Sequence, residues 1–204
     1  MNTTVFLLSP ASCGGRRAAL LLGGRGSFPL AERLRTGEAV PLAEAFCFLS
    51  GLYFRGKHAY AGAFAAPVTG TPGSFVITTN RGLQQADTPI TLDDLRAFGS
   101  VPIDPADARY REPLLRDARM LAEALPAVAR VVLLGSVASG KYVDLLLDAF
   151  GSRLLFPAEF VGRGDMSRGG LLLRCVAEGR QLEYVPVQGA QRRGSRPPRL
   201  EPRR

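Results

Sequence analysis

The segment from Arg130 to Phe156 constrains the fold more than any other part of the chain. Residues 130–134 form a β-branched, apolar run that predicts a buried strand, and a Gly/Ser turn follows at 135–140. Residues 141–150 then predict a helix, and 153–156 predict a second strand. A strand, helix and strand in so short a span form a βαβ unit with parallel strands. The chain is therefore predicted to be α/β, with a three-layer Rossmann-like sheet and flanking helices.

The rest of the first 130 residues predicts helices with a few strands. Thr91 and Asp94 match the capping-box pattern that starts a helix. Strands are expected at residues 3–8 and 74–79, and helices at 29–35, 41–49, 58–64, 91–98 and from 104 to about Pro126.

The C-terminal part predicts a loop, a β-hairpin and a tail. Residues 157–170 are too rich in glycine for a helix and too polar for a buried strand. The apolar runs 171–176 and 181–187 are expected to form a C-terminal β-hairpin. Residues 189–204 lack apolar periodicity and are expected to be disordered. The prediction is one α/β domain over 1–188 and a basic tail over 189–204.

Composition favours a cytoplasmic protein. The chain has 204 residues, of which 46% are hydrophobic, enough to bury a core. No apolar run approaches the roughly 20 residues that cross a bilayer. The N-terminus carries neither a basic region nor an apolar stretch of signal-peptide length. We expect no membrane partner. The composition does not distinguish a monomer from an oligomer.

The net charge of +8 is concentrated in the tail. Residues 189–204 hold six arginines and one glutamate, or +5, which leaves 20 basic and 17 acidic residues, or +3, in the body. Lysine occurs only at Lys57 and Lys141. The arginine excess is explained either by GC-rich coding or by a phosphate-binding surface, and these alternatives stay open.

The cysteines predict neither a disulfide framework nor a metal site. Cys13, Cys47 and Cys175 are widely spaced, with one histidine, His58, to join them. Cys47 lies in an apolar run and is expected in the core. Cys13 lies in a Gly-rich turn. It is either a structural thiol or an exposed nucleophile, and in the second case a nearby helix N-terminus would lower the pKa of the thiol.

Residues 135–141 match the phosphate-binding pattern GxxxxGK between a strand and a helix. Backbone N–H groups and a lysine in such a turn attract phosphate. Tyr142 occupies the position where a magnesium-binding Ser or Thr is required, so hydrolysis of a triphosphate is not expected. The predicted ligand-binding residues here are Gly135, Ser136, Gly140, Lys141 and Tyr142, and no cofactor is identified.

The segment 159–168 follows the second strand of the βαβ unit and gathers charge. Parallel strands end at the same edge of a sheet, so this segment is expected near the 135–141 turn. Glu159 and Asp165 are candidate catalytic carboxylates, and Arg163 and Arg168 are candidate anion-binding residues. The alternative is a loop whose charges pair with one another.

Two further polar clusters could border the same cleft. Asn80 directly follows a predicted strand and is a candidate ligand-binding residue, and the segment 53–57 carries Tyr53 and Lys57. The alternative for both clusters is the ordinary chemistry of surface turns.

The chain resembles an uncharacterised family of bacterial proteins in four segments, residues 6–10, 48–57, 133–142 and 156–170. The resemblance covers most of the chain and implies no specific activity. The strand end at 133–135, with Ala138 following, is faintly similar to one strand-turn of the uracil-DNA glycosylase fold group. That group's water-activating motif and its late histidine motif are missing here, so no catalytic residue is carried over.

The sequence leads to two hypotheses. The first is an α/β domain that binds a nucleotide, nucleobase or nucleic-acid end at the carboxyl edge of its sheet, with hydrolase or transferase activity as an extension. The second is a noncatalytic scaffold whose basic tail recruits nucleic acid or an acidic partner. The sequence does not decide whether the protein is an enzyme.

Overall fold

A six-stranded sheet forms the centre of the molecule. The computed structural model describes residues 3–23, 26–138, 140–198 and 200. The strand order is β4-β3-β1-β6-β7-β8. The strands are β1 (Thr4–Leu8), β3 (Ser74–Ile77), β4 (Leu83–Gln84), β6 (Arg130–Leu134), β7 (Leu154–Pro157) and β8 (Tyr184–Pro186). The four inner strands are parallel and the two edge strands are antiparallel to their neighbours. The predicted α/β class with a Rossmann-like sheet is confirmed.

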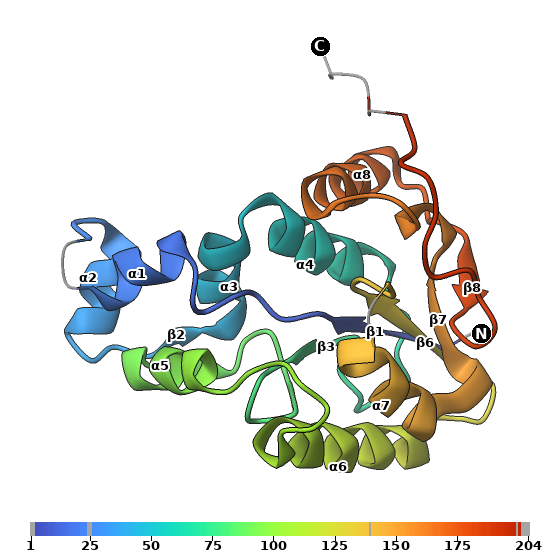
Figure 1. Cartoon of the computed structure of the whole chain (residues 1–204), viewed down its shortest axis with the longest axis horizontal. Coiled ribbons are helices and arrows are strands. Elements are labelled where there is room, and N and C mark those ends of the chain that lie inside the picture. The colour runs from blue at the N-terminus through green and yellow to red at the C-terminus, as the bar shows by residue number, and fades with distance from the viewer. Residues whose placement is uncertain (1–2, 24–25, 139, 199, 201–204) are drawn as a thin grey trace.

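Helices cover both faces of this sheet (Figure 1). Helices α4 (Leu52–Phe64) and α8 (Asp165–Glu178) pack together on one face, and α6 (Ala108–Ala124) and α7 (Gly140–Phe150) on the other. Smaller elements gather beyond the carboxyl end of β1: α1 (Arg16–Leu22), α2 (Pro29–Arg35), α3 (Leu42–Ser50), α5 (Leu92–Ser100) and the two-stranded sheet of β2 (Val40–Pro41) and β5 (Pro89–Ile90). Two short 3₁₀ helices, η1 (Gly151–Arg153) and η2 (Ala158–Phe160), flank β7.

The core is centred on β1 and β6. Every residue of β1 is buried, as are residues 131–134 of β6. Strands covered by helices on both faces are apolar at successive positions rather than at alternating ones. This is why both strands could be predicted from continuous apolar runs.

The chain leaves β1 and β6 toward opposite faces of the sheet. From β1 it reaches the neighbouring strand β3 by way of α4, and from β6 it reaches β7 by way of α7. Because β1 and β6 are adjacent and parallel, their outgoing loops diverge at the carboxyl edge. Such a topological switch point leaves a crevice where open α/β sheets bind ligands.

Most predicted elements are present, with boundaries that differ by a few residues. The capping box at Thr91 is confirmed: its hydroxyl accepts from the Asp94 N–H, and the Asp94 carboxylate accepts from the Thr91 N–H. The expected 58–64 helix is the second half of α4, and the strand expected at 74–79 ends at Ile77. The helices over 29–35, 41–49 and 104–126 correspond to α2, α3 and α6.

The C-terminal region differs from the prediction in one respect. The sheet does end in an antiparallel pair, but its strands are β7 and β8. Helix α8 contains residues 171–176, which were expected to form a hairpin strand, and residues 165–170, which were expected in a loop.

Close packing explains why this glycine-rich segment is helical. A Cβ at Gly169 would lie 2.6 Å from the carbonyl oxygen of Leu52, and one at Gly56 would lie 2.7 Å from the Gly169 oxygen. The glycines therefore let α4 and α8 approach closely, and Leu171, Leu172 and Cys175 are buried. The packing energy offsets the low helix propensity of glycine.

Residues 189–198 and Leu200 carry neither helix nor strand and contact the domain. Arg192 Nη1 lies 3.2 Å from Asp144 Oδ1, and Arg193 donates to the Ala138 oxygen at 3.4 Å. The remaining tail residues, 199 and 201–204, lie outside the described part, so the predicted disorder of the tail stays a prediction. Within the described ranges, no helix has both the length and the apolar character needed to cross a bilayer.

Candidate functional site at the carboxyl edge

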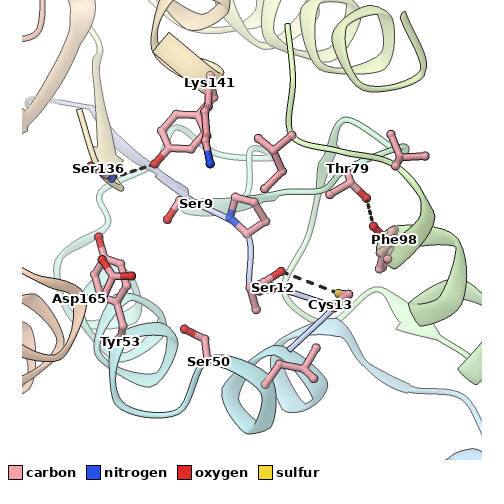
Figure 2. A pocket seen from close by; sticks show the side chains of 18 residues that line it. Ser9, Ser12, Cys13, Ser50, Tyr53, Thr79, Phe98, Ser136, Lys141 and Asp165 are labelled. Atoms are coloured by element: carbon pink, nitrogen blue, oxygen red, sulfur yellow. Dashed lines mark hydrogen bonds between the residues drawn. The ribbon is translucent and has the colours of Figure 1, made fainter. Parts of the chain in front are cut away.

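A cavity of about 700 Å³ lies at the switch point, beyond the ends of β1 and β6. Figure 2 shows the side chains around it. It is lined by residues 9–14 after β1, by Leu49, Ser50 and Tyr53 of α3 and α4, by Thr79 after β3, by Phe98, Gly99, Val101 and Ile103, by Ser136, Lys141 and Tyr142 after β6, and by Asp165 of α8. The cavity therefore brings together segments from most of the chain.

The loops after β1 and β6 touch each other at Gly135. A Cβ at this position would lie 2.8 Å from the Tyr142 hydroxyl oxygen and 2.9 Å from the Ser9 Cβ. Only glycine allows this approach. The first glycine of the phosphate-binding pattern thus has a packing role between the two loops.

Tyr142 changes the interpretation of the GxxxxGK turn. Its hydroxyl oxygen accepts a hydrogen bond from the Ser136 N–H at 2.8 Å, a donor that a phosphate would otherwise use (Figure 2). Burial raises the Tyr142 pKa, while hydrogen bonds to Ser136 and Ser9 oppose that change. Lys141 is exposed and lines the cavity. Lys141 therefore offers a ligand positive charge, while the Ser136 N–H is bound to Tyr142 and the Ala138 N–H lies 3.4 Å from the Ser136 Oγ. Ser139 of the same turn lies outside the described residues.

A buried lysine lies behind Ser9. The Lys57 side chain is fully buried, and its Nζ donates to the Ser9 carbonyl oxygen at 2.5 Å and to the Ser9 Oγ at 2.9 Å. Nζ also lies 4.5 Å and 4.9 Å from the ring centroids of Tyr53 and Phe54. Burial lowers the Lys57 pKa to about 7, and nearby Asp165 offsets only part of that effect.

Aromatic side chains supply part of the cavity wall. The Tyr53 hydroxyl is buried without a well-formed hydrogen bond to any described residue, and burial raises its pKa well above the usual range. On the other side, Thr79 Oγ1 donates to the Phe98 carbonyl oxygen at 2.8 Å and fixes α5 against the end of β3 (Figure 2). Flat apolar faces beside polar groups suit a ligand with a ring.

The structure brings some of the predicted site residues together. Ser136, Lys141, Tyr142 and Asp165 all line the cavity, as expected from parallel strand ends. Gly135 lies in the turn after β6 and Gly140 is the first residue of α7, and neither is among the described residues that line the cavity. Glu159, Arg163, Arg168 and Asn80 are absent from the described cavity lining.

The two predicted arginines make contacts inside their own segment. Arg168 is buried and donates from Nε and Nη2 to the Phe160 carbonyl oxygen at 3.2 and 3.1 Å, with Asp165 at 3.4 Å. Arg163 donates to the Glu159 carbonyl oxygen at 3.0 Å and to Ser167 Oγ at 3.2 Å. Among these described contacts, only that of Arg168 with Asp165 pairs two charges, and both residues lie in α8 rather than in a loop.

Glu159 and Asn80 each hold a buried oxygen without a hydrogen bond to a described residue. Glu159 lies close enough to Tyr60 and Cys175 to influence their pKa values. It is therefore on the α4–α8 side of the sheet rather than in the cavity. A catalytic role for Glu159 gains no support from this position.

Of the two alternatives for Cys13, the structure supports the structural thiol and contradicts the exposed nucleophile. The thiol lines the cavity wall, yet its residue is 7% exposed and burial raises its pKa to about 12. A thiol in this state is a poor nucleophile. Cys47 is half-buried and packs against the core.

Sequence reasoning missed the contact between Ser9 and Lys57. Both residues lie in segments that were singled out, but 48 residues separate them and no local pattern links them. One signal was present: the chain has 24 arginines and two lysines, and both lysines lie at or behind this cavity.

Comparison of the chain with protein-family models, with curated proteins and with solved structures found no match.

Proposed function

We propose that the protein binds a nucleotide, or a nucleobase or nucleic-acid end of similar size, in the cavity between the loops after β1 and β6. The observation that carries this proposal is the position of the cavity at the switch point of the sheet. A volume of about 700 Å³ also falls within the usual range of small-molecule sites.

The charges around the cavity favour a phosphorylated ligand. Lys141 is exposed there and forms no ion pair with the described residues, so its ammonium group is available to an anion. The carboxylate of Asp165 also lines the cavity, from α8 on the other face of the sheet, and could accept hydrogen bonds from a sugar hydroxyl or a base. Tyr53 and Phe98 also line the cavity, so a base there could contact aromatic side chains.

A thermal-shift screen tests this proposal. The full chain is heated with nucleoside mono-, di- and triphosphates, free nucleobases and inorganic phosphate, and ligands that bind the folded state raise the Tm. We expect a nucleotide to raise the Tm, and Lys141→Ala to remove most of the increase. Arg180→Ala is the matched control, because Arg180 follows the opposite end of α8 and its pair with Glu178 is exposed.

If a ligand raises the Tm of both variants, Lys141→Ala and Arg180→Ala, as much as it raises that of the wild type, the ligand binds elsewhere. No increase with any of these compounds would contradict the proposal.

The scaffold hypothesis remains the second candidate, and one observation favours a role for the tail. Arg192 pairs with Asp144 of α7, and Arg193 donates to the Ala138 oxygen in the turn before that helix. Removal of residues 189–204 separates the two hypotheses. If nucleic-acid affinity and its salt dependence disappear while the nucleotide still raises the Tm, the tail binds nucleic acid and the cavity binds the small ligand.

A further inference from the structure

We propose that Ser9 is a nucleophile and Lys57 its general base, and that the site transfers or hydrolyses an acyl group of an anionic ester. This inference rests on the proposed function, because it places the acyl carbon in the same cavity, with the anionic part of the ester near Lys141. The geometry that points to it is the 2.9 Å contact between Lys57 Nζ and Ser9 Oγ.

Ser9 is placed as a nucleophile requires. It follows β1 directly at the carboxyl edge, at the switch point, and it lines the cavity. Its carbonyl oxygen accepts from Lys57, which fixes the backbone that carries the hydroxyl. Lys57 is fully buried behind Ser9, and it is absent from the described lining of the cavity.

Lys57 has the surroundings of an amine base. No carboxylate forms an ion pair with it among the described residues, and its closest ring contacts are Tyr53 and Phe54. Asp165 and Arg168 of α8 and Cys47 of α3 are the titratable or charged groups that influence it. These ring contacts and the hydrogen bonds to Ser9 stabilise the ammonium in part, but burial without an ion pair has the larger effect and favours the neutral amine near neutral pH. The pKa of about 7 agrees with this reading of the geometry.

The composition of the chain supports an amine at this position. The protein uses arginine for almost all of its positive charge, with 24 arginines and two lysines. A guanidinium could replace an ammonium that only donates hydrogen bonds, but it cannot lose its proton at physiological pH. A buried lysine at this position is therefore able to accept a proton, which an arginine could not do.

The chemical step conserves atoms and charge. In the neutral form Lys57 keeps an N–H to the Ser9 carbonyl oxygen and turns its lone pair toward the Ser9 O–H. As Oγ forms a bond to the acyl carbon, Lys57 Nζ takes the hydroxyl proton and the carbonyl π electrons move onto oxygen. Those electrons return as the bond to the leaving alkoxide breaks, and the leaving group takes the proton. In the second half of the reaction, water or an acceptor alcohol gives its proton to Lys57 Nζ as its oxygen bonds to the acyl carbon. The bond from that carbon to Ser9 Oγ then breaks, Oγ takes the proton back from Lys57, and a carboxylic acid or a new ester leaves.

A fluorophosphonate tests the nucleophile without knowledge of the substrate. This probe forms a Ser Oγ–P bond and loses fluoride, and mass spectrometry of the full chain locates the adduct. We expect one adduct, at Ser9, which Ser9→Ala removes. Lys57→Met should slow labelling at least about 100-fold while the protein stays folded. Ser152→Ala is the control, because Ser152 is exposed in η1 beyond the opposite end of the sheet.

The pH profile separates a base from a residue that only holds the loop. With a pKa of about 7, labelling of the wild type should rise about tenfold between about pH 6 and about pH 8. A Lys57→Arg variant that keeps the fold should lack this rise, since arginine donates but does not deprotonate.

Equal labelling of Ser9→Ala and wild type, or no adduct on folded wild-type protein, would overturn the proposal. The Tm experiments keep the two proposals apart. If nucleotides raise the Tm of wild type and Ser9→Ala alike but Ser9 is never labelled, the nucleophile is refuted and the binding site stands. If Ser9 is labelled and no nucleotide raises the Tm, the nucleotide site is refuted and the nucleophile stands.

Discussion

Replacement of Lys57 by methionine should remove a specific dependence of stability on pH. Burial lowers the Lys57 pKa from 10.5 to about 7 in the folded protein. Between these two values the unfolded chain binds a proton that the folded chain lacks, so the free energy of unfolding increases with pH. A pKa difference of about 3.5 corresponds to a change of about 5 kcal/mol in the free energy of unfolding. This change lies between a pH at which both states carry the proton and a pH at which neither does.

Only part of this increase can be measured cleanly. Burial, partial at Cys47, raises the thiol pKa values of Cys13, Cys47 and Cys175. Above about pH 8.5 the unfolded chain therefore loses protons that the folded chain keeps, and stability falls. Between about pH 6 and about pH 8.5, the Lys57 contribution integrates to about 2 kcal/mol.

Urea unfolding at a series of pH values measures this contribution. The wild type should gain about 2 kcal/mol more stability across this range than Lys57→Met, which has no ionisable group at this position. Because the comparison is a difference between two proteins, groups that titrate equally in both cancel. The same slope in both proteins would refute the argument that Lys57 is neutral in the folded state.

Other predictions concern packing and thiol reactivity. Gly169→Ala should destabilise the protein by about 1–3 kcal/mol in urea unfolding, because its Cβ would lie 2.6 Å from the Leu52 oxygen. Gly62→Ala in α4 should instead stabilise by about 0.5–1 kcal/mol, because a Cβ there meets nothing within 4 Å. Iodoacetamide should modify Cys47 before Cys13 in the folded protein, as peptide mass spectrometry would show, since Cys13 is buried with a pKa of about 12.

The sequence predicted the sheet better than the C-terminal helix. Strands β1 and β6 are continuous apolar runs, and the helix at Thr91 begins with a capping box, so local chemistry determines both. Helix α8 is different. Its glycines disfavour a helix locally, and only their contact with α4, more than 100 residues earlier in the chain, makes the helix favourable.

The candidate site shows the same division. Lys141 and Asp165 were predicted to lie near one another because parallel strands end at one edge, and both line the cavity. The contact between Ser9 and Lys57 depends on where α4 packs relative to the end of β1. No spacing in the sequence predicts that packing. Arg168 was predicted to bind a ligand because it is charged, yet its burial and hydrogen bonds to Phe160 give it a structural role.

Hydrogen–deuterium exchange tests the position of the binding site most directly. The full chain is exchanged with and without a saturating nucleotide, chosen as the compound that raises the Tm most. We expect slower exchange in peptides that cover residues 9–14, 49–53 and 136–142, with little change elsewhere. Protection confined to other segments, or a bound nucleotide that protects none of these three, would contradict the claim that the switch point of this sheet is the ligand site.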